Sequence, residues 1–259
     1  MVKIGIIGGS GVYDPKLLED TQELKISTPF GRTSDVVTVG KFKGVDVVFI
    51  PRHGRGHAIN PTNVPYRANI WAMKELGVTH IFAPSAVGSL KEEYKPGDLV
   101  FTDQFIDRTT KRISTFYEGS KVCHISVAEP CCGKLRNLLA EHAYKLQIPH
   151  HKTGTCVVVE GPRFSTKAES RLFRSWGADI IGMTMVPEAV LAREAEICYA
   201  TIAMSTDYDV WREGHVSFEE VIKTMGSNVE KMRKLLTSVI PVVKDEDCSC
   251  RHALETALI

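Results

Sequence analysis

Apolar residues recur along the chain in short runs that indicate buried β-strands. Several runs are apolar at consecutive positions and rich in Val, Ile and Ala, as in strands that are covered on both faces. Six candidates are residues 3–7, 35–39, 45–50, 80–83, 155–159 and 200–204. Lys43 and Gly44 lie between the second and the third candidate, and they predict a hairpin there.

Helical signatures fall between these strand candidates. Capping boxes, in which Ser or Thr is followed three residues later by Glu, mark two helix starts, and proline and glycine mark other helix ends. These signals predict helices over residues 63–76 and 166–176, from Pro187, and from Ser217 to Pro241. Strands alternating with helices predict an α/β fold. We expect a single domain over residues 1–259, with a central mixed β-sheet flanked by helices and a C-terminal tail of about 242–259.

Charge and composition exclude several classes of function. Lys and Arg total 32 against 31 Asp and Glu, so the chain lacks the basic excess that is typical of nucleic-acid binding. No apolar run approaches the ~20 residues that span a bilayer. The first residues run directly into a strand candidate, with no signal-peptide pattern. We therefore expect a cytoplasmic protein with neither a nucleic-acid nor a membrane partner.

The seven cysteines show the pattern of reduced intracellular thiols, because their number is odd and no secretion signal precedes them. Cys248 and Cys250 form a close pair near the end of the chain. No second pair at a matching spacing would complete a zinc site, so the spacing predicts no metal. Disulfide formation or redox activity of the C-x-C pair remains open.

Candidate chemistry collects where strands are expected to end, since ligands of open α/β sheets bind beyond the strand ends. The first strand is followed by GGSG, whose spacing fits neither the dinucleotide nor the phosphate-loop motif. Its backbone N–H groups and the Ser10 hydroxyl would still suit an anion. Arg52 and His53 follow the strand at 45–50 and offer donors to phosphate. The alternatives are a tight turn and a solvated basic loop.

Three later junctions carry small, hydroxyl-bearing or adaptable apolar side chains. Such residues suit a close backbone approach, a planar ring or a sugar face. They are Ser85 and Ala86, Phe164 and Ser165, and Met183 and Thr184. Taken singly, a turn or a core position explains each of them better.

The strand candidate at 200–204 leads to two carboxylates, Asp207 and Asp209. Acids at positions i and i+2 of an extended segment project to the same side. Two acids so close raise one another's pKa, so that one can hold a proton near neutral pH and act as a general acid on a heterocycle nitrogen. An acidic surface turn is the alternative.

In their order along the chain these motifs resemble one family. GIIGGSG, PRHGRGH, YRANIWA, SAVGSL, DQFIDRT, EGPRFST, MTMVPE and TDYD together resemble the 5′-methylthioadenosine phosphorylases, of the trimeric branch of the purine nucleoside phosphorylases. The resemblance covers about residues 3–241. It implies the α/β fold of that family and an enzyme, a pentosyltransferase, that uses inorganic phosphate to release adenine from a methylthio-nucleoside. It implies no metal and no organic cofactor.

The resemblance also implies roles for the matching residues. Phosphate would be held by Ser10, Arg52, His53, Ser85, the backbone of Ala86, and Thr184. The nucleoside would contact Phe164, Ser165, Met183, Asp207, Asp209, His124, Phe218 and Val221. Asp207 would protonate N7 of the base, with Asp209 beside it. His124 would reach the neighbouring subunit's site in a trimer or a dimer of trimers. By the same likeness, Cys132 and Cys198 could form a disulfide, and Cys248 and Cys250 a C-x-C tail.

Three other functions stay open on the residues themselves. A phosphorylase for 6-oxopurine nucleosides needs a donor to O6, whereas Asp207 and Asp209 are acceptors that suit a 6-amino group. A non-catalytic nucleoside-binding module would release no adenine. A nucleoside hydrolase would act without phosphate, and the phosphate-type donors at Arg52, His53 and Thr184 disfavour it.

Overall fold

The computed structural model describes residues 1–9, 18–212 and 218–259. The strands are β1 (Lys3–Gly8), β2 (Glu19–Leu24), β3 (Ser27–Thr28), β4 (Gly31–Arg32), β5 (Val37–Phe42), β6 (Val45–Pro51), β7 (His80–Ser89), β8 (Leu99–Val100), β9 (Gln104–Arg108), β10 (His150–His151), β11 (Thr155–Val159), β12 (Ile180–Gly182) and β13 (Cys198–Asp207). The α-helices are α1 (Tyr66–Glu75), α2 (Gly133–Lys145), α3 (Lys167–Ser175), α4 (Met185–Glu194) and α5 (Phe218–Val239). Short 3₁₀ turns are η2 (Arg55–His57), η3 (Pro61–Asn63), η4 (Ile240–Val242) and η5 (Ser249–His252).

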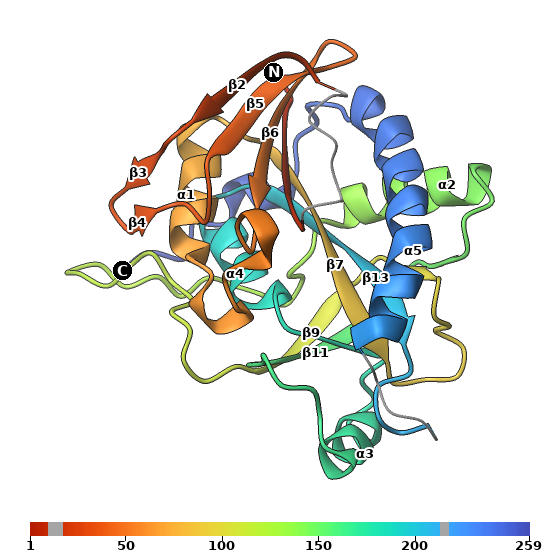
Figure 1. Ribbon diagram of the computed structural model, residues 1–259. Helices are drawn as coiled ribbons and strands as arrows, with labels where there is room; N and C mark the ends of the chain where they lie inside the picture. The colour runs from red at the N-terminus through yellow and green to blue at the C-terminus, as the bar shows by residue number, and fades with distance from the viewer. Residues whose placement is uncertain (10–17, 213–217) are drawn as a thin grey trace.

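The strands form one mixed sheet of eleven strands, apart from the separate pair β3 and β4. The sequence predicts the mixed sheet and six of its strands. The main path of the sheet runs β10-β8-β13-β7-β1-β6-β5-β2, and β9, β11 and β12 branch from it through β7. The central strands β6, β1, β7 and β13 are parallel. The hairpin expected at Lys43 and Gly44 joins the antiparallel strands β5 and β6, and both residues have the positive φ that a tight hairpin turn requires. Figure 1 shows β7 and β13 crossing the middle of the molecule.

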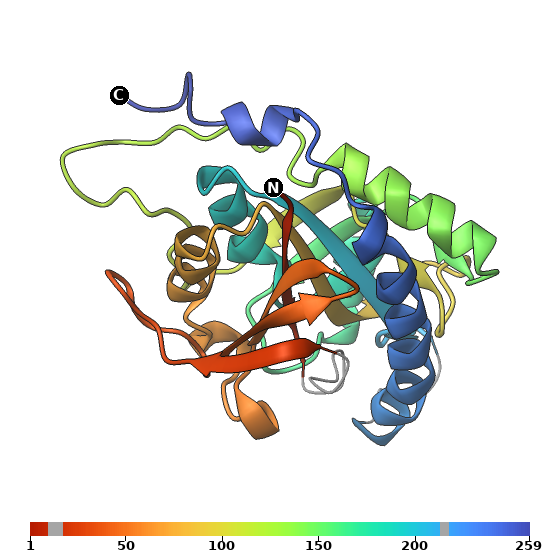
Figure 2. The ribbon, with the colours of Figure 1, turned by 90° about the horizontal axis from the view of Figure 1, so that it is seen from above.

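Helices cover both faces of the central strands. One buried cluster joins Ile4 and Ile6 of β1 to residues of α2 and α5, including Leu139 and Leu235. The other joins Ile7 of β1 to residues of α1 and α4. Figure 2 shows α2 and α5 together on one side of the sheet and α1 and α4 on the other. Each fully buried large aliphatic side chain contributes about 1.5–3 kcal/mol, which explains the consecutive apolar runs of these strands.

Several predicted boundaries need correction. The strands expected at 80–83 and 200–204 extend to Ser89 and Asp207, because β7 and β13 pair in parallel along nearly their whole length. The small residues of β7 therefore lie in a strand and not in a loop. The strand expected at 35–39 begins at Val37, and the helix expected from residue 63 begins at Tyr66, after the separate turn η3.

The helix signals are confirmed where a side-chain cap is present. Thr166 Oγ1 accepts the Glu169 N–H at 3.1 Å, and the Glu169 carboxylate accepts the Thr166 N–H at 2.8 Å. The matching cap at Ser217 lies outside the described residues. The sequence contains no capping signal that predicts α2, because its N-cap residue, Cys132, makes no side-chain capping bond.

The C-terminal tail of 242–259 runs back over the domain. Its last residues pair with the segment around Cys123, where the N–H of His124 donates to the Ala257 carbonyl at 2.8 Å and Cys123 bridges Leu258. Figure 2 shows this pairing segment extended away from the sheet, on the same side as the C-terminus. Within the described residues, the helices are all too short or too polar to cross a membrane.

Candidate active site

The predicted site residues follow or end strands that lie together in the sheet. Arg52 follows β6, Ser85 and Ala86 lie in the second half of β7, and Asp207 ends β13. Because β6, β7 and β13 are parallel, their carboxyl ends meet at one edge of the sheet, which is where ligands of such folds bind. Thr184 follows β12 and Phe164 follows β11, which pair with the same end of β7 directly or through one strand.

Arg52 is held by the protein itself. Its Nε and Nη2 donate to the Glu188 carboxylate at 2.7 and 2.8 Å, and both side chains are almost fully buried. Nη2 also donates to the Ile7 carbonyl at 2.8 Å, and Nη1 to the Pro84 carbonyl at 2.9 Å. Four of the five guanidinium N–H groups are thus engaged, so that at most one remains for a phosphate. The alternative of a solvated basic loop is wrong at Arg52.

Burial disfavours the charge of Arg52, but the Glu188 carboxylate outweighs it and raises the pKa of Arg52 above its usual range. Glu188 in turn accepts the Tyr199 hydroxyl at 2.9 Å. This buried network links β1, β7, β13 and α4 at the base of the candidate phosphate site. Sequence analysis missed Glu188, for which the only signal was an acidic residue at a helix start.

His53 is buried as well, and its ring stacks on His57 with centroids 4.2 Å apart. Its Nδ1 lies 2.8 Å from the Ile59 carbonyl oxygen, which can only accept, so Nδ1 carries a proton. Burial, helped by the charge of Arg52, lowers the pKa of His53 to about 4. The ring is therefore neutral at pH 7, and its Nε2 can accept a bond from the P–OH group of hydrogen phosphate.

The other phosphate candidates differ in exposure. Thr184 is buried at the N-cap position of α4, but its side chain makes no capping bond, which leaves the hydroxyl for another partner. Ser85 is half-buried and Ala86 is exposed, and β7 places them opposite Ala203 and Met204 of β13. Ser10 lies outside the described residues.

Asp207 is oriented by two protein donors. The Thr206 hydroxyl donates to its Oδ1 at 2.6 Å, and the N–H of Asp209 donates to its Oδ2 at 2.9 Å. A register shift in the pairing of β13 with β7 falls at Thr206. A Cβ added to Gly88 of β7 would lie 3.0 Å from the same Oδ2. Any larger residue at this position would therefore displace the Asp207 carboxylate.

Asp209 does not lie on an extended segment, so the expectation of two acids alternating along a strand is wrong. The strand ends at Asp207, and Asp209 has a φ of 47°, in the turn that follows. It is buried, and its Oδ2 has no hydrogen-bond partner among the described residues. Burial raises the pKa of Asp209, although the nearby hydroxyls of Ser170 and Ser165, neither of which makes a hydrogen bond of good geometry among the described residues, oppose the shift. The expectation was that the two acids raise one another's pKa; the structure gives a raised pKa for Asp209, and burial is its largest cause.

The base-stacking candidate Phe164 is 45% exposed, so the alternative that it is a core residue is wrong. It follows Gly161, which has a φ of 67° and packs against Met183: a Cβ there would lie 2.5 Å from the Met183 sulfur. The loop after β11 and the loop after β12 therefore lie in direct contact.

Arg112 fastens these two loops together. Its side chain is 1% exposed, and Nη1 donates to the carbonyls of Met183 and Val186 at 2.5 and 2.6 Å. Nη2 donates to the Glu160 carbonyl at 2.7 Å, and Nε lies 3.1 Å from the Glu160 carboxylate. Despite partial burial, the N–H groups of Thr110 and Lys111 together with Arg112 lower the pKa of Glu160 to about 2. Sequence analysis missed Arg112, which lies three residues beyond the end of the family motif DQFIDRT.

The remaining candidates lie apart from this cluster or outside the description. His124 is exposed on the segment that pairs with the C-terminus. Val221 is half-buried near the start of α5, about two turns before Asn228, whose side chain donates to the Ser205 carbonyl at 2.8 Å. That bond ties α5 to the end of β13. The side chain of Phe218 lies outside the described residues.

Comparison with known proteins decides the family. The family model described as "Phosphorylase superfamily" matches residues 3–241.

The chain belongs to the phosphorylase superfamily.

Relatives of this phosphorylase match over more than nine-tenths of their own length. The S-methyl-5'-thioadenosine phosphorylase of Thermofilum pendens is 56% identical over 259 residues, which are 100% of this chain and 99% of that protein. A methylthioadenosine phosphorylase structure from an Antarctic soil metagenomic library is 43% identical, with a TM-score of 0.95 over 100% of this chain and 92% of the other. The Schistosoma mansoni methylthioadenosine phosphorylase in complex with adenine is 40% identical, with a TM-score of 0.93 over 98% and 96%. These likenesses confirm the predicted α/β phosphorylase fold.

Proposed function

We propose that the chain is a 5′-methylthioadenosine phosphorylase, which converts the nucleoside and inorganic phosphate into adenine and 5-methylthioribose 1-phosphate. The full-length likeness to phosphorylases of that name supports this function. Within the site, the observation that carries it is the buried carboxyl group of Asp209, with a raised pKa and an unpartnered oxygen, beside the oriented carboxylate of Asp207. This pair suits a purine with a 6-amino group and a basic N7.

The proposed reaction breaks the C1′–N9 bond and forms a bond between C1′ and a phosphate oxygen. The electron pair of the broken bond passes to adenine, and a proton is delivered to N7, so that adenine leaves as a neutral base. The sugar passes through an oxocarbenium-like state, as in glycoside cleavage, which the bound phosphate stabilises by its charge before it attacks C1′. Inorganic phosphate is a co-substrate, and the scheme needs no metal or organic cofactor.

The acid is assigned to the Asp207 and Asp209 pair. We propose that Asp207 delivers the proton to N7 and that Asp209 accepts from the 6-amino group. The bonds from the Thr206 hydroxyl and the Asp209 N–H hold Asp207 in one orientation. The raised pKa of Asp209 beside it lets the pair keep the proton that Asp207 passes to N7, and Asp209 Oδ2 has no donor of good geometry among the described residues. A 6-oxopurine would place a second acceptor at Asp209, and a site that leaves buried polar groups unpaired rejects such a substrate strongly.

Phosphate is proposed to bind between the end of β6, the second half of β7 and the start of α4. Arg52 contributes one N–H and a positive charge, and neutral His53 accepts from the P–OH group. Thr184 donates to the phosphate from its hydroxyl group, which makes no capping bond to α4. Ser10, Ser85 and the Ala86 backbone complete the proposed set. Preorganised donors of this kind supply most of the catalytic effect in phosphate-dependent reactions.

Met183 is proposed to lie under the ribose, with Phe164 and Ser165 facing the base. Phe218 and Val221 are proposed to line the methylthio pocket. We further propose a homo-oligomer, a trimer or a dimer of trimers, in which His124 enters the neighbouring site. Its place on an extended segment away from the sheet supports this proposal (Figure 2).

The test is an adenine-release assay on methylthioadenosine, adenosine and inosine, each with and without phosphate. Base release from methylthioadenosine that requires phosphate is the expected result. Release without phosphate would indicate a hydrolase, and a preference for inosine would indicate a 6-oxopurine enzyme. Binding without any release would indicate a non-catalytic module.

A further inference from the structure

The turn that carries Asp209 is closed at both ends by neighbouring residues of β7. At its start, Asp207 pairs with Gly88 in the sheet. At its end, the indole Nε1 of Trp211 donates to the Ser89 carbonyl at 2.8 Å. Ser89 is fully buried at the end of β7, where it pairs with β12, so the acceptor belongs to the sheet itself. The two acids therefore lie in a short closed loop whose ends meet consecutive residues of β7.

The indole of Trp211 also packs against α3. The guanidinium carbon of Arg174 lies 3.9 Å from the centre of the Trp211 ring, which is a cation–π distance. Trp211 is half-buried and packs on a small apolar cluster that includes Phe173 of α3 and Ile181 of β12. The indole thus joins three parts of the molecule: the turn, the end of β7 and α3.

Further contacts of the turn lead to the segment that follows β7. The ring of Tyr208 lies edge-on to Trp211 with centroids 5.6 Å apart, and the Arg212 guanidinium carbon lies 4.1 Å from the centre of the Tyr208 ring. Arg212 in turn forms an ion pair with Glu92. Both members of this pair are exposed, so solvent screens it. The bond from the indole to the sheet is therefore the stronger restraint on the turn.

Asp209 depends on such a restraint. Its φ of 47° lies in the left-handed region, which a residue other than glycine keeps only where the surrounding structure holds it. Its carboxylate lies near the hydroxyl of Ser170, which is four residues before Arg174 on α3 and hence on the same face of that helix. One face of α3 thus lies against both the acid and the indole two residues beyond it.

We propose that Trp211 is a positioning residue, which holds the turn of Asp209 where the acid pair meets the base. The proposal rests on the proposed function, in which Asp207 protonates N7 and Asp209 accepts from the 6-amino group. Without the bond to Ser89, the turn can relax from its left-handed conformation, and the two acids lose their common alignment. None of the proposed phosphate ligands lies in this turn, so the loss should lower turnover and leave phosphate binding unchanged.

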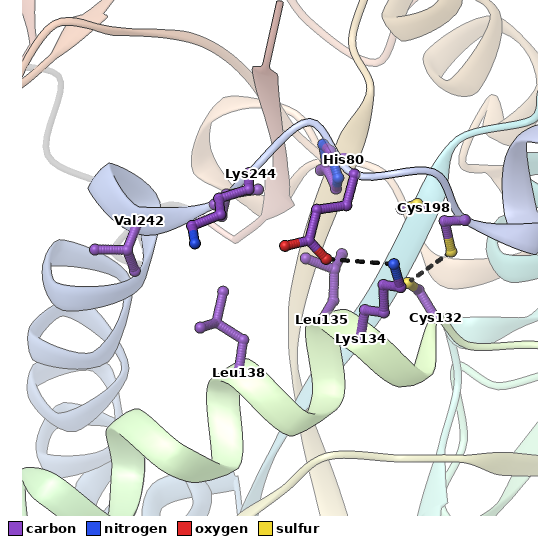
Figure 3. A pocket seen from close by; sticks show the side chains of 11 residues that line it. His80, Cys132, Lys134, Leu135, Leu138, Cys198, Val242 and Lys244 are labelled. Atoms are coloured by element: carbon purple, nitrogen blue, oxygen red, sulfur yellow. Dashed lines mark hydrogen bonds and ion pairs between the residues drawn. The ribbon is translucent and has the colours of Figure 1, made fainter.

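The opposite end of β13 provides an internal reference for such a test. A cavity of about 210 Å³ opens there between α2 and the tail, and Figure 3 shows Leu135 and Leu138 lining it from α2, near Cys198. Four cysteine sulfurs lie within 4.8 Å of one another at this end, in a cluster formed by Cys132, Cys198, Cys248 and Cys250. This region is about 30 Å along the strand from the turn, so a change confined to the turn should leave its amides unaffected.

The first measurement is amide hydrogen exchange of the full chain, read by mass spectrometry of its peptides, in the wild type and in Trp211→Phe. Phenylalanine keeps a ring beside Arg174 but cannot donate to Ser89. The Asp209 N–H is protected by its bond to Asp207 Oδ2, and we expect its peptide to exchange about tenfold faster in the variant, because the turn opens more often. Peptides of α2 should not change. Unchanged exchange of the turn would overturn the proposal, whatever the activity.

The second measurement is steady-state kinetics with methylthioadenosine and phosphate. We expect Trp211→Phe to lower kcat about 10–10²-fold, since a misplacement of about 1 Å can cost about 10²-fold. KM for phosphate should stay within about twofold of the wild-type value, because uniform binding of phosphate is retained. The matched control is Trp176→Phe at the end of α3, a 43% exposed tryptophan that also lies beside an arginine, Arg108, and should keep normal turnover. An unchanged kcat in Trp211→Phe, or a parallel rise in KM for phosphate, would overturn the proposal.

A further variant leaves the core untouched. Arg174 is exposed, and Arg174→Met keeps an aliphatic side chain but removes the charge beside the indole. We expect kcat to fall several-fold, and the loss in the double variant with Trp211→Phe to be smaller than the product of the two, because both residues act through one contact. Arg171→Met, exposed on the same helix, is the control. Wild-type protein that releases no adenine would contradict the proposed function, whereas hydrogen exchange decides the role of Trp211 in either case.

Discussion

The two ends of β13 carry different chemistry. Its carboxyl end holds Asp207 with Asp209 just beyond it, and its first residue is Cys198 of the cysteine cluster, about 30 Å away along the strand. The carboxyl end is built from loops after neighbouring strands, held by Arg52 and Arg112. The other end joins α2 and the distant tail. The carboxyl end suits reaction on a ligand, because a buried polar atom there, Asp209 Oδ2, has no hydrogen-bond partner among the described residues. The end at Cys198 suits attachment of the tail, because its cysteine sulfurs lie close to one another.

The largest expected effect separates the two ends by activity. Asp207→Asn and Asp209→Asn should each lower kcat/KM for methylthioadenosine about 10²–10⁴-fold, the range of general acid catalysis. The control is Asp20→Asn, an exposed aspartate with a φ of 52° that asparagine tolerates equally well. Near-normal turnover in both variants would remove the acid pair from the mechanism.

The next effect tests whether the carboxyl end depends on its buried ion pair. Glu188→Ala leaves the charge of Arg52 buried without its partner, and we expect a loss of about 3–5 kcal/mol in the free energy of unfolding, measured by urea denaturation. The exposed pair of Lys145 with Glu141 provides the contrast, and Glu141→Ala should leave the free energy of unfolding nearly unchanged, because solvent screens an exposed ion pair. Equal losses in the two variants would contradict the network described for Arg52.

A pH effect of intermediate size should come from His53. Its folded-state pKa of about 4 lies below the unfolded value, so the unfolded chain binds more protons between pH 4 and about 6.5. The free energy of unfolding should therefore fall as pH drops through this window, with about 2 kcal/mol of that fall between pH 7 and pH 5 due to His53. His53→Asn, which keeps a donor for Ile59, should lack this share. Identical pH dependence in the variant and the wild type would exclude His53 as its source.

The smallest effect concerns how closely β7 approaches the acid pair. In Gly88→Ala the new Cβ would press on Asp207 Oδ2 and on Ile181, and we expect a cost of about 1 kcal/mol together with a several-fold lower kcat. Gly226→Ala is the control, because nothing lies within 4 Å of its Cβ and alanine favours the interior of α5. It should leave kcat unchanged and stabilise the chain slightly. Unchanged turnover in Gly88→Ala would show that the carboxylate tolerates displacement.

Local signals along the chain were sufficient for the alternation of strands and helices and for the capped start of α3. They were also sufficient to name the strand ends that carry polar residues, because parallel strands bring their carboxyl ends to one edge whatever the remaining details. The family motifs pointed to the same residues. All of these signals depend only on residues within a few positions of one another along the chain.

The tertiary structure alone decided how those residues are used. Arg52 is engaged by Glu188, 136 residues away, and Arg112 by loops 48 to 74 residues away. Burial, which no local sequence pattern encodes, raises the pKa of Asp209. The cysteine cluster is the clearest case, since Cys132 and Cys248 are 116 residues apart and no spacing rule connects them. Sequence determined which groups are available, but burial, pairing and charge are set by contacts between distant segments, which exist only once the chain has folded.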